Sequence, residues 1–95
     1  MDKLTLKVVT PHGSKGPIHC DSIHFNIHDN KSGQGGGNYG IRTGQANSLF
    51  ALKKGKLLAY HQHEIILQLN CENGFATVEN DIVTVTVEGM EIIKE

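Results

Sequence analysis

The chain has 95 residues, a size that allows one domain of ordinary dimensions. Nine basic residues stand against ten acidic residues, and Arg42 is the only arginine. This near-neutral balance excludes the basic footprint of a non-specific nucleic-acid-binding protein. No apolar run reaches the roughly 20 residues that a membrane-spanning helix needs, and the first residues are not typical of a signal peptide.

Aliphatic residues must form the core, because aromatic residues make up only 5% of the chain and tryptophan is absent. Two cysteines, Cys20 and Cys71, could form one disulfide at most, and their spacing matches no zinc-binding motif. We expect both to be reduced, half-buried thiols of a cytosolic protein.

Apolar and polar residues alternate with a period of two, which indicates half-buried β-strands. The alternation is clearest in residues 4–8, 23–27 and 83–87. A more continuous apolar run at residues 64–70 predicts a strand covered on both faces. The residues expected to point into the core are Leu6, Val8, Ile23, Phe25, Ile27, Leu67, Leu69, Val83, Val85 and Val87.

Turn-forming residues separate these strands. Residues 11–17 predict a turn between the first two strands, and residues 53–56 predict a tight polar link. An Asn-Gly hairpin signal occurs at residues 71–74, and residues 79–81 close another hairpin. Residues 45–52 are the one segment that could form a short helical turn.

Short strands at this spacing predict an all-β fold, a sandwich or a barrel, in a single domain over residues 1–95. The loop at residues 30–37 contains only glycine and polar residues, without an apolar anchor. We expect this loop to be mobile.

No arrangement of residues predicts a catalytic centre. Residues 35–40 fit the pattern G-x-G-x-x-G, but no βαβ unit accompanies it, as dinucleotide binding would require. Cys20 lies between His19 and Asp21, yet neighbouring strand residues point to opposite faces and cannot form a triad. We therefore expect a protein that is not an enzyme and that binds no cofactor.

His61 and His63 are the two histidines best placed to share a metal ion. They lie two residues apart on one predicted strand face, roughly 6.6 Å at the usual rise per residue. A site would need a third ligand, and no spacing in the sequence supplies one. A small metal-binding β protein stays open as an alternative, with exposed histidines as the simpler explanation.

Residues 37–55, GNYGIRTGQANSLFALKKG, resemble the signature segment of the epsilon subunit of F-type ATP synthases. That family has the pattern G-x-L/F-G-I-x-P-G-H-A-P-L-x-x-x-L-x-x-G at this place. Residues 4–10 resemble the opening strand of the family, and residues 74–87 resemble its later hairpin. The resemblance extends over nearly the whole chain.

The chain departs from the family pattern at Thr43, Gln45 and Asn47, where the family has Pro, His and Pro. Family members continue into a C-terminal two-helix hairpin that regulates ATP hydrolysis, and these 95 residues contain no such segment. The regulatory role and the nucleotide binding of those helices are therefore not expected here.

The resemblance implies a flattened β-sandwich of about ten short strands. It also implies a non-catalytic central-stalk subunit of a proton-translocating ATP synthase, which binds the gamma subunit and the c-ring and couples ion flow to ATP synthesis. Such a subunit lies at the cytoplasmic face of the cell membrane, attached only through the complex. The alternative is a stand-alone β-sandwich adaptor without a rotary partner.

The resemblance also implies partner contacts at four residues. Asn38, Arg42 and Gln45 match the family's edge that docks to the c-ring, and Phe50 matches a position that would contact the gamma subunit. The guanidinium of Arg42 offers a planar fork of donors to carboxylates or to loop carbonyls.

Overall fold

The computed structural model describes residues 4–27 and 37–94, which form nine strands. No helix in these ranges is long and apolar enough to span a membrane. The all-β prediction is confirmed, whereas the loop predicted to be mobile lies outside the described residues except for Gly37. The strands are β1 (Leu4–Thr10), β2 (Gly13–Cys20), β3 (Ser22–Ile27), β4 (Gly37–Arg42), β5 (Ser48–His61), β6 (Glu64–Cys71), β7 (Gly74–Glu79), β8 (Ile82–Val87) and β9 (Met90–Lys94).

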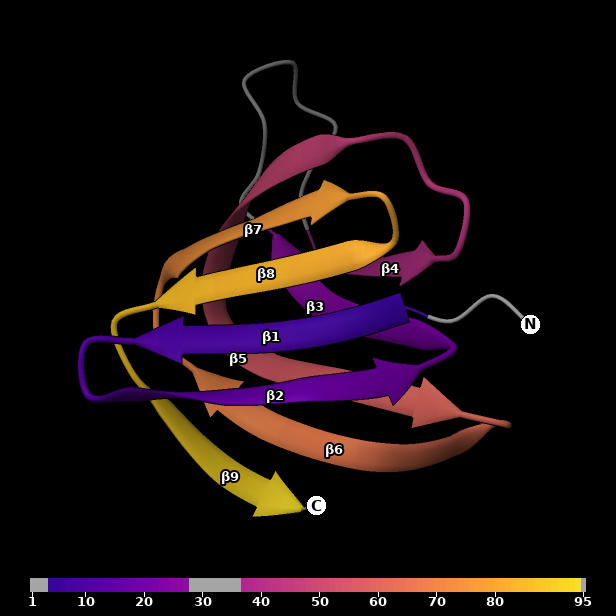
Figure 1. Ribbon diagram of the computed structural model, residues 1–95. Helices are drawn as coiled ribbons and strands as arrows, with labels where there is room; N and C mark the ends of the chain where they lie inside the picture. Colours follow the sequence, from indigo (N-terminus) through magenta and orange to yellow (C-terminus); the bar gives the residue numbers. More distant parts are fainter. Residues whose placement is uncertain (1–3, 28–36, 95) are drawn as a thin grey trace.

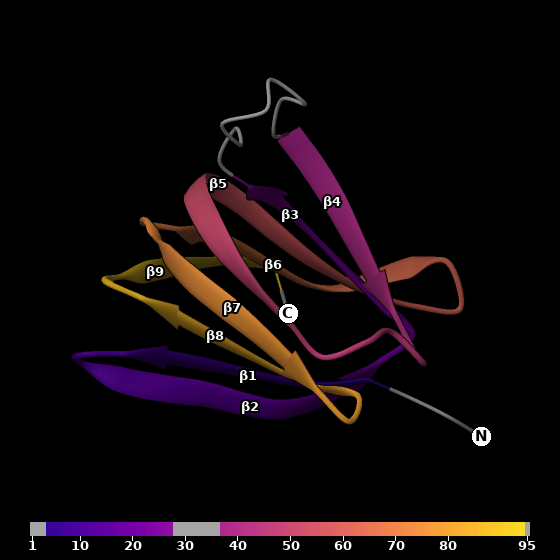
Figure 2. The same cartoon turned by 90° about the horizontal axis from the view of Figure 1, so that it is seen from above.

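The strands pair in one mixed sheet that curls over on itself (Figure 1). Its main path runs β2-β1-β8-β7-β5-β3-β4; β6 branches from β5, and β9 pairs with β6. Only β1 and β8 run parallel among the described pairs. Seen from above, β1, β2 and β8 lie on one side of the molecule, and β3 and β4 lie on the other (Figure 2). The result is a sandwich-like fold with a shared interior.

The 14-residue strand β5 joins the two sides. Its first part, residues 48–52, pairs with β7, and its second part, residues 55–61, pairs with β6. The pairing with β3 is interrupted between Leu52 and Leu57. The Asn73 side chain accepts a hydrogen bond from the Lys54 backbone N–H (2.8 Å) at this point. The polar link predicted at residues 53–56 is therefore a bend within one strand.

The core is aliphatic, as the composition predicts. Every predicted core residue whose side chain the structure describes is buried; the side chain of Ile27 is not among them. The strand pattern did not identify the remaining buried residues, which are Leu4, Cys20, Ile41, Leu52, Leu57, Ala59, Cys71, Ala76 and Val78. Both cysteines are free and fully enclosed rather than half-buried.

Two segments predicted as turn or helix are strands. Only Pro11 and His12 separate β1 from β2, because the polar residues from Gly13 onward pair with β1. Pro17 is tolerated there because β2 is an edge strand, where a missing N–H leaves no neighbour unpaired. The helical turn predicted at residues 45–52 is also wrong, since β5 begins at Ser48.

Of the two predicted hairpins, the one at residues 79–81 is confirmed and the one at residues 71–74 is wrong. Asn80 and Asp81 close the β7–β8 hairpin with positive φ angles of 50° and 63°, as predicted. Asn73 and Gly74 do not close a hairpin, because β6 and β7 do not pair. Gly74 is needed for another reason, since a Cβ there would overlap the carbonyl oxygen of Thr86 on β8.

The strand predicted at residues 64–70 is present as β6, but it is not covered on both faces. Leu67, Leu69 and Cys71 are buried, and the residues between them are exposed or half-exposed. The continuous apolar run arises because Ile65 and Ile66 occupy half-exposed positions at the beginning of the strand.

The close approach of β7 and β8 at Gly74 gives a stability prediction. Gly74→Ala would place a methyl group against Thr86 and 2.8 Å from Val87 Cα, so we expect a loss of about 1–3 kcal/mol or more. Gly89→Ala is the matched control, because its Cβ would meet only Glu72 Cγ at 3.5 Å. Urea unfolding measures both; equal stability of the two variants would contradict the strand pairing.

The buried thiols give a pH prediction. Burial, helped by the adjacent carboxylates Asp21 and Glu72, raises the pKa of Cys20 and of Cys71 from 9.0 to about 11. The folded state thus holds these protons more tightly than the unfolded state, so stability falls as the pH rises from about 9 to about 11. The free energy of unfolding should decrease less over this range in Cys20→Ala/Cys71→Ala. An identical pH dependence would contradict the prediction.

Candidate partner interfaces

Arg42 and Asn38 both lie on β4, at the end of the sheet path. Arg42 is the last residue of the strand, exposed, and in register with Ser22 of β3. Asn38 lies four residues earlier, in register with Asn26. This spacing corresponds to roughly 13 Å along the strand. The two positions therefore mark opposite ends of one edge strand.

Gln45 lies in the loop between β4 and β5, and its side chain reaches inward. Its amide N–H donates to the Tyr39 hydroxyl at 3.3 Å. Tyr39 packs against the core, with its ring centroid 4.7 Å from that of Phe50 and 6.2 Å from that of Phe25. Because residues alternate along β4, Arg42 faces away from this aromatic cluster. The structure thus separates Arg42 from Gln45.

The loop that carries Gln45 is fixed by the β7–β8 turn. The Gly44 N–H donates to Asp81 Oδ1 at 2.8 Å, and the Asn80 N–H donates to Asn47 Oδ1 at 3.2 Å. Gly44 has a positive φ of 80°. No local pattern in the sequence could reveal this contact, since its partners lie more than 30 positions apart.

Phe50 is half-buried, and its neighbours on β5 point outward. The ring packs against Phe25 and Tyr39 at the rim of the core. Leu49, by contrast, is 70% exposed. With Ala51 and Phe75 they line a shallow apolar hollow of about 490 Å³. Phe50 is therefore the floor of this hollow rather than its outer surface.

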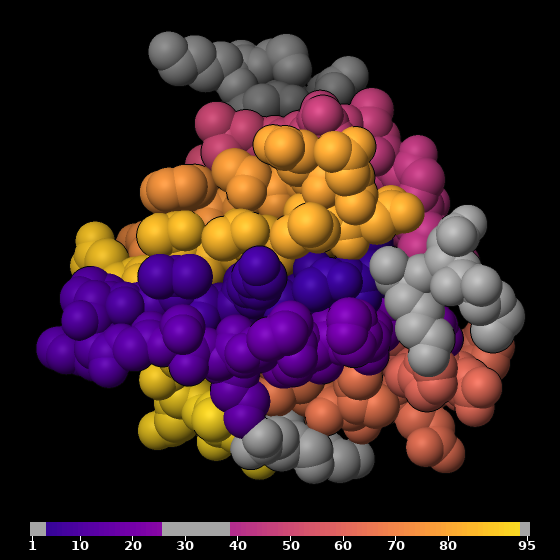
Figure 3. Space-filling model, viewed as in Figure 1, coloured from indigo at the N-terminus to yellow at the C-terminus, as the bar shows by residue number. Residues whose placement is uncertain are grey.

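The hollow belongs to a larger apolar face on the outer side of β1, β8, β7 and the first part of β5. Two neighbouring rows of residues cross these four strands in register. Phe75 lines both this hollow and a second hollow of about 470 Å³. Figure 3 shows the side of the molecule on which β1, β7 and β8 lie. The rows are Val9–Thr86–Phe75–Ala51 and Lys7–Thr84–Thr77–Leu49.

We call these eight residues the apolar face. Lys7 is its one charged member, and Thr77, Thr84 and Thr86 are its uncharged polar members. Leu49 and Phe75, at 70% and 45% exposure, are among the largest exposed apolar side chains of the described chain. Clustered exposed apolar groups of this kind mark protein interaction sites.

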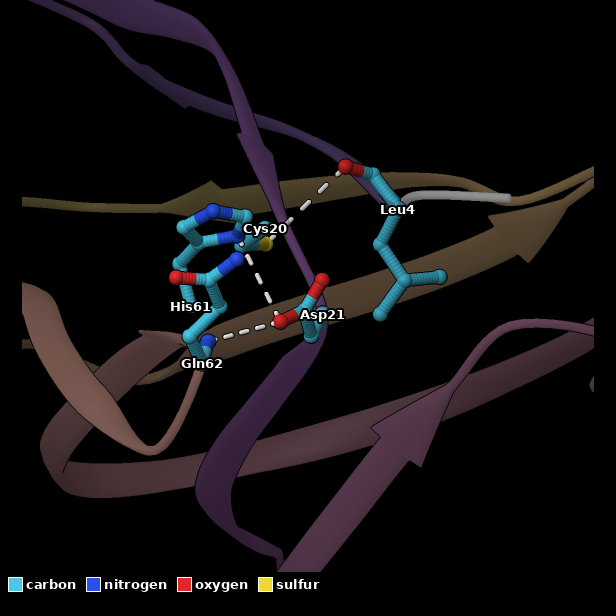
Figure 4. Close-up of polar contacts among 5 residues, drawn as sticks. All are labelled: Leu4, Cys20, Asp21, His61 and Gln62. Atoms are coloured by element: carbon cyan, nitrogen blue, oxygen red, sulfur yellow. Dashed lines mark hydrogen bonds and ion pairs between the residues drawn. The ribbon is translucent and has the colours of Figure 1, made fainter. Parts of the chain in front are cut away.

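A polar pocket of about 300 Å³ lies on the outer side of β3, β4 and β5, and we call it the Arg42 pocket. Its floor includes Ser22, which is in register with Arg42 on one side and Tyr60 on the other. Asp21 Oδ2 accepts a hydrogen bond from the Gln62 N–H at 2.7 Å and lies 3.4 Å from His61 Nδ1 (Figure 4). The pocket is lined by Asp21, Ser22, His24, Arg42, Tyr60, Gln62 and His63.

The predicted pairing of His61 with His63 on one strand face is wrong. β5 ends at His61, and His63 lies in the following turn with a φ of 68°. In the part of the chain that the structure describes, no group of three His, Cys, Asp or Glu side chains could hold a metal ion.

No protein-family model matches the sequence, and no curated protein is similar enough to be recognised as a relative. The fold does have counterparts among solved structures. A chain in the Euglena gracilis mitochondrial ATP synthase (OSCP, F1 and c-ring) aligns over 95% of this chain, with a TM-score of 0.75 and 17% identity. A chain in the central stalk and c-ring structure of Tetrahymena thermophila mitochondrial ATP synthase aligns over 95%, with a TM-score of 0.69 and 16% identity.

The alignments cover 53% of the Euglena chain and 66% of the Tetrahymena chain. The chain thus spans between about half and two thirds of the length of these neighbours. At this level of identity the likeness shows a shared fold.

The contact between the β4–β5 loop and the β7–β8 turn gives a prediction. Asp81→Ala removes the acceptor for Gly44 and places alanine at a φ of 63°. We expect a loss of about 1–2 kcal/mol and faster hydrogen exchange at the Gly44 amide. Asp81→Asn is the control, because asparagine keeps an acceptor and tolerates this φ. Unchanged exchange at Gly44 in Asp81→Ala would show that the turn does not hold the loop.

Proposed function

We propose that this chain is an epsilon-like subunit in the central stalk of an F-type ATP synthase. The observation that carries the proposal is the fold, which aligns over 95% of the chain with chains found in ATP synthase structures. The resemblance of residues 37–55 to the signature segment of the family supports the same assignment, because it depends on the sequence and not on the fold. In this role the chain binds and transmits force, and it performs no covalent chemistry.

The apolar face is the surface we assign to the gamma subunit. A long-lived subunit contact is commonly apolar at its centre and depleted of charge. The two rows across β1, β8, β7 and β5 are depleted of charge, with one lysine at their edge. Their apolar side chains are Val9, Leu49, Ala51 and Phe75, and threonines occupy the remaining central positions. Phe50 would take part from the floor of the hollow, beneath Leu49 and Phe75.

The β4 edge is the surface we assign to the c-ring. Asn38 and Arg42 lie on this strand, and Gln45 lies in the loop that follows it, with its side chain amide bonded to the Tyr39 hydroxyl. β4 ends the sheet path, so its outer edge pairs with no other strand of the described residues. The edge belongs to the opposite side of the sheet from β1 and β8, which suits a subunit placed between two partners (Figure 2). The chain would couple proton flow to ATP synthesis from the cytoplasmic face of the cell membrane, attached only through the complex.

Binding to the gamma subunit of the same organism tests the proposed contact between the apolar face and that subunit. We expect the purified chain to form a stable complex, and Leu49→Ser/Phe75→Ser to weaken its affinity about tenfold or more, because the variant removes the exposed apolar groups. Ile92→Ser/Ile93→Ser on β9 is the matched control, since these side chains are 44% and 45% exposed and lie outside the apolar face. It should bind normally.

Absence of binding at micromolar concentrations would favour the stand-alone adaptor instead. Equal weakening by both double variants would remove the apolar face as the gamma contact.

The coupling of proton flow to ATP synthesis in reconstituted ATP synthase tests the proposed contact between the β4 edge and the c-ring. The triple variant Asn38→Ala/Arg42→Ala/Gln45→Ala should keep its affinity for gamma and lose coupling between proton flow and ATP synthesis. Full coupling in this variant would remove the β4 edge as the c-ring contact.

A further inference from the structure

We propose that the Arg42 pocket receives a carboxylate side chain, an aspartate or glutamate, from the protein segment that docks at the β4 edge. The inference rests on the proposed function and deepens it, because it names the chemical group that the edge recognises.

The floor of the pocket is fixed by strand pairing. Arg42, Ser22 and Tyr60 lie in one register row across β4, β3 and β5. The ring of His24 lies over Gly40, where a Cβ would come within 3.1 Å of it. The same ring meets Tyr60 edge to face at 5.0 Å. The rings of His24 and Tyr60 and the backbone of Arg42 are held in place before any ligand arrives, which reduces the entropy lost on binding.

The carboxylate and the backbone N–H of Asp21 already bond to other residues of this chain. Its carboxylate accepts a hydrogen bond from the Gln62 N–H at 2.7 Å and lies 3.4 Å from His61 Nδ1 (Figure 4). Its own N–H donates to the Tyr60 carbonyl at 2.7 Å. Asp21 therefore fastens the β5–β6 turn to the beginning of β3 and shapes one wall of the pocket.

Arg42 is the cationic group available to a ligand. Its side chain is exposed and makes no hydrogen bond or ion pair with any described residue. A guanidinium presents a planar fork that matches the two oxygens of a carboxylate. The hydroxyl groups of Ser22 and Tyr60 in the same row offer further donors.

The balance of charge favours a carboxylate over a phosphate. The permanently charged side chain of the pocket is one guanidinium, and Asp21 places one carboxylate beside it, so the pocket lacks the cluster of arginines and lysines that a dianion needs. Phosphate sites commonly use backbone N–H groups at a helix N-terminus or in a glycine-rich nest. The walls here are side chains on strands and a tight turn, and the described residues contain no helix.

The position of the pocket favours a protein as the source of the carboxylate. The pocket includes the last residue of β4, the strand that ends the sheet path and whose outer edge pairs with no strand in residues 4–27 and 37–94. A segment that docks along this edge could place one acidic side chain beside Arg42. A volume of about 300 Å³ has room for such a side chain.

A titration with small probes tests the chemistry directly. The probes are the capped tripeptide Gly-Asp-Gly, its amide counterpart Gly-Asn-Gly, and inorganic phosphate, each followed by NMR of the folded chain. We expect saturable shifts at Ser22, Arg42 and Tyr60 with the aspartate peptide alone. Arg42→Gln should weaken this binding about tenfold or more, and Lys56→Gln, an exposed cation elsewhere on β5, should leave it unchanged. Tighter binding of phosphate, or no binding of the aspartate peptide, would overturn the proposal.

Binding to the detergent-solubilised c-ring tests the same pocket in the complex. Arg42→Gln should weaken c-ring binding about tenfold or more, and Arg42→Lys should weaken it less, because lysine keeps the charge and loses the fork. Affinity for gamma should not change in either variant. If Arg42→Gln binds the c-ring as well as the original chain, the pocket proposal fails and the proposed function stands. If the original chain binds neither subunit, the proposed function fails, and the peptide titration still decides what the pocket binds.

Discussion

The fold depends on β5, because this one strand pairs with neighbours on both sides of the curled sheet. β5 pairs with β7 along its first part and with β6 along its second part, and it bends between them at residues 53–56. The bend is fastened by the hydrogen bond from Lys54 to Asn73, and the glycine at position 74 lets β8 come close to β7. With this arrangement a single sheet encloses an aliphatic core in a chain of 95 residues.

The same bend separates the two candidate surfaces. The first part of β5 carries Leu49 and Ala51 to the apolar face, and the second part carries Tyr60 to the Arg42 pocket. One surface carries exposed apolar side chains among threonines and a single lysine, and the other is a small polar pocket with a single arginine. In the role we propose, the chain would hold one partner firmly and contact another, and two surfaces of different chemistry on opposite sides suit that role.

The sequence predicts the strands whose outer residues are polar and whose inner residues are aliphatic, such as Val83–Val85–Val87. It fails where a strand contains residues that also form turns. The alternation does not predict β2 because Gly16 and Pro17 interrupt it, and residues 53–56 predict a link rather than a bend of β5 because they are polar or glycine. Arg42 could be singled out as the only arginine. Its companions in the pocket could not, because strand register alone brings Ser22 and Tyr60 beside it.

The central claim is that the chain is a constituent of an ATP synthase stalk, and cross-linking of the intact complex tests it most directly. The complex would be purified from the source organism and treated with a lysine-reactive cross-linker, and the linked peptides would be identified by mass spectrometry. The account predicts that the chain remains with the complex and that Lys7, within the apolar face, is linked to the gamma subunit. A chain that separates from the complex, or a Lys7 linked only to proteins outside the stalk, would contradict it.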